Sequence, residues 1–377
     1  MSQYDDQLKT KEAHETIQLQ PMKRRRSGRK PLIVVTVVTL VALGGLPELP
    51  MTVYGASFLG LLGSWIVGLR LLGKRRQTVL TETSLPSSQS AVPSSSLLKA
   101  LRKHPLLSYF SIAYAIKFIL LVPVTLAAWG IISGDWQLAF VIATFGPFAG
   151  GMIMTYATEG KPGLSRLKNR VRQWRIGWRW LLFAFAIVPA LVMLGVIIQP
   201  GALAGFQGVT PVLLVSYPLT YVAIWFGGGG LDEEVGWRGF ALPRMQPRYG
   251  PMLTVLFLGV LHCFWHFEEF FTPAQGGGPG TGWTPFLVNL PIFLLIVISC
   301  TIILNWVSNR THGSLFAAIS THTSFDAPQG ALIPLFPAVG ATSLMLGATI
   351  GLGVPALLIL ILTHGRVGYQ RAPKLIS

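Results

Sequence analysis

Residues 284–307 read TPFLVNLPIFLLIVISCTIILNWV, a stretch without a charged residue. A helix of about twenty apolar residues crosses a hydrocarbon core roughly 30 Å thick, so this stretch predicts a membrane-spanning helix. Comparable stretches recur along almost the whole chain, which is 51% hydrophobic and 12% charged over 377 residues. An ordinary soluble domain carries about 25% charged residues. The composition therefore predicts an all-α, polytopic transmembrane helix bundle.

The apolar stretches predict about 8 to 10 spans, because the first of them is short. The candidates are 32–47, 51–73, 106–133, 137–158, 179–199, 209–228, 251–271, 284–307, 313–330 and 343–363.

Polar segments divide the chain into five parts. These are a polar cytoplasmic tail (1–31), two N-terminal spans (32–73), a flexible basic linker rich in Ser and Pro (74–105), the main bundle (106–363) and a basic cytoplasmic tail (364–377). Ser- and Pro-rich composition is typical of flexible segments. The run GGGG at 227–230 lacks the lysine of a phosphate loop and predicts a helix break.

Lysine and arginine occupy alternate connections, mainly 74–103, 161–175 and 364–377. The opposite connections carry neither residue: 134–136, 200–208, 272–283 and 331–342. Because basic loops stay in the cytoplasm, we expect a multi-pass protein of the cell membrane with both termini cytoplasmic. The net charge of +16 is spread over these connections. It predicts membrane lipid as a partner rather than nucleic acid.

Acidic residues are rare after Gly160, and histidines lie close to them in the sequence. The acids are Asp232, Glu233, Glu234, Glu268, Glu269 and Asp326, and the nearby histidines are His262, His266 and His322. A charge in hydrocarbon costs several kcal/mol, so such residues usually face a wet cavity or a partner. They therefore predict a functional site, with a buried network that only fixes helix packing as the alternative.

The two glutamates of the segment EEVGWRG are expected to have different roles. Glu234 and Arg238 are four residues apart on one helical face and can pair, whereas Glu233 points about 100° away and is expected to stay free. A carboxylate near a histidine in a low-dielectric site can serve as a general base. Glu233 is therefore the candidate base.

Two spacings bring further groups toward Glu233. The turn signal PRYGP at 247–251 should reverse the chain, which places Glu233 and His266 at nearly equal depth, about 24 Å from the turn. His322 and Asp326 are four residues apart and share a helical face.

EEVGWRG (233–239), HCFWH (262–266) and NRTHGSLFAAISTHTSFDA (309–327) stand in this order. The pattern resembles the CAAX-protease and bacteriocin-processing family, also called abortive-infection proteins, and is similar to type II CAAX prenyl endopeptidases. The resemblance covers about 106–363 and implies an intramembrane protease bundle. The implied enzyme is a hydrolase that cleaves a peptide bond in a membrane-associated or prenylated protein or peptide.

The resemblance also implies roles for individual residues. Glu233 and His266 would activate water, and His322 with Asp326 would assist at the oxyanion. Glu234 and Arg238 would support the site. Asp326 stands where the family usually has Asn, and an ionised Asp accepts but does not donate a hydrogen bond.

His262 occupies a position where the family usually has an aromatic residue. Two histidines four residues apart on a helix are at ligand spacing, so His262, His266 and His322 are candidate metal ligands. We expect no cofactor, with zinc as the alternative. If His262 is structural, it can pair with Glu268 or Glu269 nearby.

Two other classes of function remain open. A transporter or channel also uses intramembrane carboxylates, and Lys117, alone in a predicted span, favours that reading slightly. A catalytically silent membrane scaffold is the third reading. Loss of substrate cleavage in Glu233→Gln would distinguish the enzyme from both.

Overall fold

The computed structural model describes residues 96–370. Every regular element in this range is helical, which confirms the all-α prediction. The α-helices are α4 Ser96–Lys103, α5 Pro105–Ala128, α6 Gln137–Thr144, α7 Gly146–Val171, α8 Trp178–Leu182, α9 Val188–Ile197, α10 Leu213–Phe226, α11 Leu231–Glu234, α12 Leu242–Tyr249, α13 Pro251–Trp265, α14 Thr284–Arg310, α15 Leu315–Ala331 and α16 Ala341–Leu362. Short π-helical turns are η2 Phe183–Ile187 and η3 Val235–Ala241, and 3₁₀ turns are η4 Phe267–Phe271, η5 Pro273–Gln275 and η6 Ile333–Leu335.

Five helical segments in the described range are long and apolar enough to cross a membrane, and the bent pair α6–α7 makes a sixth. In two of the predicted spans, 209–228 and 313–330, the observed helix is shorter than the predicted span. The first contains α10 with 14 residues, and the second corresponds to α15 with 17 residues. The predicted spans 32–47 and 51–73 lie outside the described residues, and the five-part division of the chain stays a prediction.

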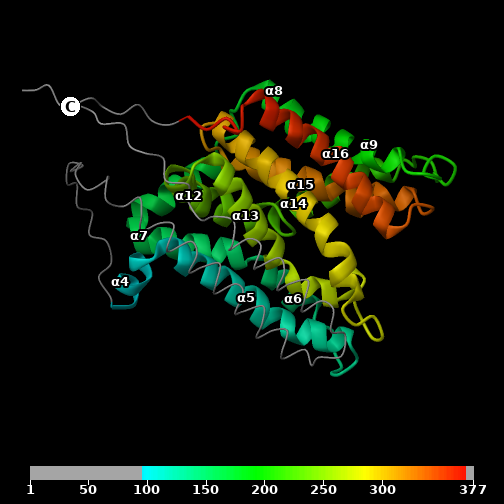
Figure 1. Cartoon of the computed structure of the whole chain (residues 1–377), viewed down its shortest axis with the longest axis horizontal. Coiled ribbons are helices and arrows are strands. Elements are labelled where there is room, and N and C mark those ends of the chain that lie inside the picture. The colour runs from blue at the N-terminus through cyan, green and yellow to red at the C-terminus, as the bar shows by residue number, and fades with distance from the viewer. Residues whose placement is uncertain (1–95, 371–377) are drawn as a thin grey trace, which may run out of the picture.

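The helices form successive layers in Figure 1. Helices α5, α6 and α7 lie at one side, α8, α9 and α16 lie at the other, and α13, α14 and α15 lie between them. Direct packing of α14 on α16, α15 on α9 and α15 on α7 joins the layers. Within the layers, α5 packs on α7, α13 on α14 and α9 on α16. The predicted turn at PRYGP is present, since Gly250 separates α12 from α13 with a φ of 79°.

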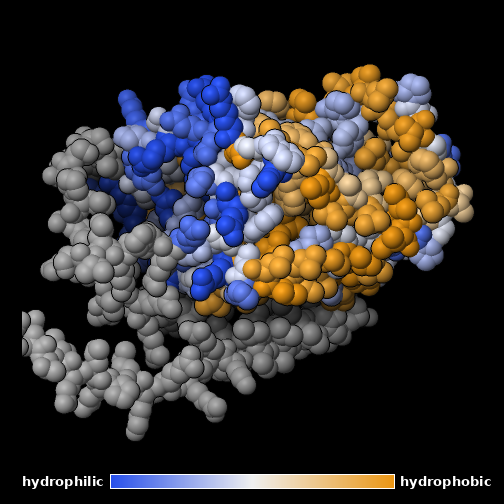
Figure 2. All heavy atoms as spheres, turned by 90° about the horizontal axis from the view of Figure 1, so that it is seen from above, coloured by the Kyte–Doolittle hydropathy of each residue, from blue (hydrophilic) through white to orange (hydrophobic). Residues whose placement is uncertain are grey.

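Polar and apolar residues separate along the molecule. Figure 2 shows hydrophilic side chains gathered at one end of the visible face, the end at which Figure 1 places α4 and α12, and a mainly hydrophobic surface beyond it. Large apolar side chains are exposed in the described residues, such as Leu214 on α10 at 78% and Leu362 on α16 at 77%. An apolar exterior of this kind fits contact with lipid chains.

An aromatic core holds η3 in the middle of the bundle. Trp237 and Phe240 of η3 are fully buried and pack on Tyr109 of α5, with ring centroids 5.7 and 5.3 Å apart. Trp265, at the end of α13, packs on Trp237 at 6.0 Å. This core fixes the segment that carries the acidic motif against the segment that carries the histidines.

Candidate active site

The acidic motif begins at a glycine-rich break. Helix α10 ends at Phe226 and α11 begins at Leu231, as the GGGG run predicts. The carboxylate of Asp232 accepts hydrogen bonds from the backbone N–H groups of Gly228 at 2.9 Å and Gly229 at 3.0 Å. These two glycines have φ values of 138° and 116°, which residues other than glycine rarely adopt. Asp232 therefore braces the loop from which the next two carboxylates project.

Glu234 and Arg238 form the ion pair that their spacing predicts. Arg238 Nη1 donates to Glu234 Oε1 at 2.8 Å, and both side chains are fully buried. The same carboxylate oxygen lies 2.7 Å from Nδ1 of His322 on α15. Arg238 Nε also donates to Asn305 of α14 at 3.3 Å, a contact that the sequence motifs did not indicate. One ion pair thus ties η3 to two other helices.

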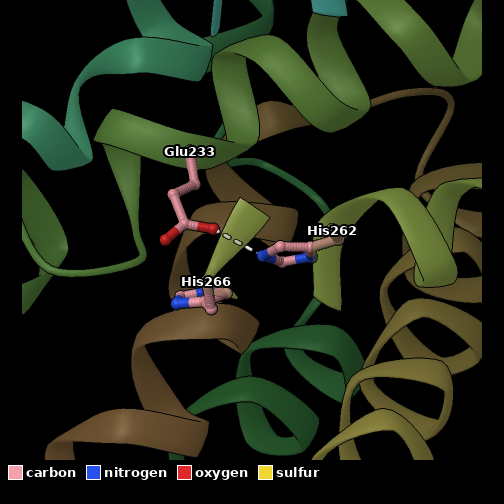
Figure 3. Close-up of side chains that lie close together, drawn as sticks. All are labelled: Glu233, His262 and His266. Carbon is pink, nitrogen blue, oxygen red and sulfur yellow. Dashed lines mark hydrogen bonds and ion pairs between the residues drawn. The ribbon is translucent and has the colours of Figure 1, made fainter. Parts of the chain in front are cut away.

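Glu233 faces the histidines of α13. Its Oε2 lies 2.7 Å from Nε2 of His262 and accepts a hydrogen bond from Trp237 Nε1 at 3.1 Å. Figure 3 shows the second carboxylate oxygen, Oε1, pointing away from His262. Glu233 is therefore engaged at one oxygen, which corrects the expectation that it stays free.

His262 and His266 exchange the partners expected for them. The sequence suggested Glu268 or Glu269 as partners of His262, but His262 lies against Glu233. His266 approaches Glu269 instead, with Nδ1 3.0 Å from Oε1. The predicted equal depth holds, because Glu233, His262 and His266 gather in one cluster (Figure 3).

His322 and Asp326 lie together, with Nε2 of the imidazole 3.5 Å from Oδ2 of the carboxylate. The glycine-rich break passes directly over them. A Cβ atom added at Gly229 would lie 2.6 Å from that Asp326 oxygen and 3.2 Å from His322 Nε2. The rings of His322 and His262 have centroids 6.0 Å apart. The three sequence motifs therefore converge on a single site.

One group of side chains in the described residues could hold a metal ion. Glu233, His262 and His266 each offer a ligand atom, and these atoms lie within 4.8 Å of one another. A carboxylate and two imidazoles are a suitable donor set for zinc. His322, a candidate ligand from the sequence, is not part of this group.

Lys117 has a partner, which the sequence did not reveal. Its ammonium lies 2.5 Å from Oε1 of Glu269 and 3.9 Å from the centroid of the Trp265 ring. Lys117 and Glu269 are far apart in the chain, so local spacing gave no signal. The only indication of this pair in the sequence was that both residues are charged and lie within apolar stretches.

Comparisons with known proteins agree with the motifs. A family model described as type II CAAX prenyl endopeptidase, Rce1-like, matches residues 215–328. This segment contains every predicted site residue from Glu233 to Asp326. A protein called CAAX prenyl protease 2 from Methanococcus maripaludis is 22% identical over 205 residues, which are 50% of this chain and 70% of that protein. The resemblance inferred from the sequence is thereby confirmed, and it supports a multi-pass membrane hydrolase.

Proposed function

We propose that this chain is an intramembrane endopeptidase that hydrolyses a peptide bond in a membrane-associated or prenylated substrate. One observation carries the proposal: Glu233, buried between apolar helices, contacts His262 and lies in one cluster with His266. Carboxylate and imidazole side by side in a low-dielectric site can activate water for attack on a carbonyl. The match of the type II CAAX prenyl endopeptidase model over 215–328 and the similarity to CAAX prenyl protease 2 over 205 residues support the same chemistry.

In the proposed reaction, Glu233 Oε1 takes a proton from water while the water oxygen bonds to the scissile carbonyl carbon. His266 orients this water. The carbonyl oxygen becomes an oxyanion, which His322 stabilises through Nε2, since its Nδ1 faces Glu234. The carbon–nitrogen bond then breaks, and Glu233 returns the proton to the leaving amine.

The supporting groups act on the orientation of these residues. Glu234 holds His322 at 2.7 Å, and Arg238 holds Glu234 at 2.8 Å. Asp326 lies at the Nε2 side of His322 and orients or polarises it. We expect Gly229 to be required there, because any side chain would collide with Asp326.

We propose chemistry without a metal, in which Glu233 and His262 interact directly at 2.7 Å. Zinc is the alternative mechanism, and the donor set of Glu233, His262 and His266 favours it. The transporter alternative loses the slight support that Lys117 gave it, because Lys117 is paired with Glu269.

The test compares membrane proteomes of cells that produce the full chain or its Glu233→Gln variant. New protein termini that appear with the full chain and are absent with Glu233→Gln identify substrates. A purified, reconstituted protein should then cleave a peptide spanning such a site, with prenylated and unprenylated versions compared. Identical termini in both cell types would overturn the proposal.

A further inference from the structure

Lys117 is a fully buried cation that the proposed reaction does not use. It projects from α5, outside residues 215–328 that the family model matches. Its ammonium is held by Glu269 at 2.5 Å and lies over the face of the Trp265 ring at 3.9 Å. An ammonium within hydrocarbon is costly even when it is paired, and such residues usually have a function.

Glu269 connects Lys117 to the site. Its Oε1, the oxygen that contacts Lys117, also lies 3.0 Å from Nδ1 of His266. His266 directly follows the last residue of α13, and Glu269 lies three residues later in η4, so local chain geometry brings the two together. The side chain of His266 is 18% exposed and that of Lys117 is 0%, which places the ion pair behind the histidine.

Aromatic and imidazole rings also pack around the His266 ring. Its centroid lies 5.3 Å from that of Phe293 on α14 and 5.5 Å from that of His262. Nδ1 makes no fully aligned hydrogen bond within the described residues. Glu269 Oε1 is nevertheless within reach at 3.0 Å, and rotation of the ring would align the N–H with it. Catalytic hydrogen bonds often align only when substrate is bound.

A neutral imidazole carries one hydrogen, so its two nitrogens have opposite properties. If Nδ1–H donates to Glu269, Nε2 keeps its lone pair and can accept a proton or bind a metal. A carboxylate behind a histidine fixes the tautomer and ring orientation in this way at many catalytic sites. A lysine behind the carboxylate supplies a counter-charge and holds the carboxylate's rotamer.

We propose that Lys117 and Glu269 are positioning residues that fix the tautomer and orientation of His266. The proposal rests on the proposed function only in that His266 is taken to act on water. The competing explanation is an ion pair that merely packs α5 against η4. Removing one partner does not separate the two explanations, because the buried charge left behind destabilises the protein in either case.

Two double variants separate them. Lys117→Met with Glu269→Gln, and Lys117→Met with Glu269→Met, both remove the two charges together and leave no unpaired ion. The glutamine carbonyl can still accept a hydrogen bond from His266 Nδ1, whereas methionine cannot. We expect equal thermal stability for the two proteins, with kcat lower by about 10- to 100-fold and an unchanged KM in the methionine variant. Equal kcat in both variants would overturn the proposal.

A second measurement does not depend on peptide cleavage. Nitrogen NMR of protein labelled with ¹⁵N-histidine reports which ring nitrogen carries hydrogen, and comparison with His266→Gln identifies the His266 signal. We expect a hydrogen on Nδ1 alone in the wild type and in the glutamine variant, with this preference lost in the methionine variant. A hydrogen on Nε2 in the wild type, or a signal unaffected by Glu269→Met, would overturn the proposal. The expected signals without any substrate cleavage would instead sink the proposed function and leave the positioning intact.

Discussion

At the scale of single residues, the two carboxylate oxygens of Glu233 lie in different environments. One oxygen is engaged by His262 and Trp237, which fixes the carboxylate, and the other has no hydrogen bond within the described part of the chain. A general base needs this combination of fixed position and an available lone pair. In its neighbour Asp232, both carboxylate oxygens accept hydrogen bonds from the backbone of the glycine-rich loop. Adjacent carboxylates therefore have distinct duties.

We expect Glu233→Gln to lower cleavage by at least about 10²-fold while the protein stays folded, because glutamine has the same shape but is not a base. Activity of the reconstituted protein and its thermal unfolding test this expectation. Glu159→Gln is the matched control, since Glu159 contacts only Arg166 and Arg244 among the ion pairs of the described residues. Full activity in Glu233→Gln would rule out Glu233 as the base.

Glu234→Gln should destabilise the protein by about 3 to 5 kcal/mol, because it leaves Arg238 buried without its counter-charge. Glu234→Gln combined with Arg238→Met should recover much of that stability. Activity should not return in the double variant, because His322 also depends on Glu234. Thermal unfolding of the two proteins measures the difference, and unchanged stability in the single variant would contradict the pair.

We expect His262→Phe to lower cleavage, because the direct partner of Glu233 is lost. Under the metal-free mechanism, the metal content of the purified protein should be the same in the wild type and in this variant. Metal analysis and activity are measured on the same samples. Stoichiometric zinc in the wild type, lost together with activity in His262→Phe, would show that the zinc mechanism is correct.

At the scale of elements, the helices approach closely where glycines face each other. A Cβ atom added at Gly195 of α9 would lie 2.1 Å from the backbone oxygen of Gly347 on α16. One added at Gly351, one turn along α16, would lie 2.3 Å from the backbone oxygen of Leu191. Small residues at such positions allow van der Waals packing between membrane helices, where no hydrophobic force drives association.

Gly195→Ala should therefore destabilise the protein by about 1 to 3 kcal/mol, because α9 and α16 must move apart. Gly353→Ala is the control on α16, since its added Cβ would meet nothing closer than Ser299 Oγ at 3.7 Å. The control should be neutral or slightly stabilising, as alanine favours helix more than glycine does. Thermal unfolding in detergent compares the two, and a neutral Gly195→Ala would count against close packing.

At the scale of the whole molecule, charge separates from apolar surface (Figure 2). The basic residues at the ends of α4, α7 and α12 include Lys103, Lys168 and Arg248. Basic connections are retained in the cytoplasm, so we propose that this polar end faces the cytoplasm.

A cysteine introduced at Ser165, an exposed position on α7, tests this orientation. Cys263 and Cys300 are first replaced by Ala to remove background labelling. We expect a membrane-impermeant thiol reagent to label the cysteine only after the cells are opened. Labelling of intact cells would reverse the proposed topology.

Local features of the structure could be predicted from the sequence. The apolar stretches predicted the long helices, the spacing of Glu234 and Arg238 predicted their ion pair, and the PRYGP segment predicted the turn. These features depend on a helix period, a turn conformation or transfer of side chains to lipid, all of which act over a few residues. The order of the motifs also sufficed to indicate the family resemblance.

Contacts between helices could not be predicted in the same way. Whether Glu233 meets His262 or His266 depends on a rotation of α13 by about 40°, which sequence spacing does not determine. The pairing of Lys117 with Glu269 depends on how α5 packs beside η4. The sequence by itself therefore determined the helices, the turn and the set of reactive residues. Only the tertiary structure decided which of those residues touch, because helix rotation and depth are set by packing across the whole bundle.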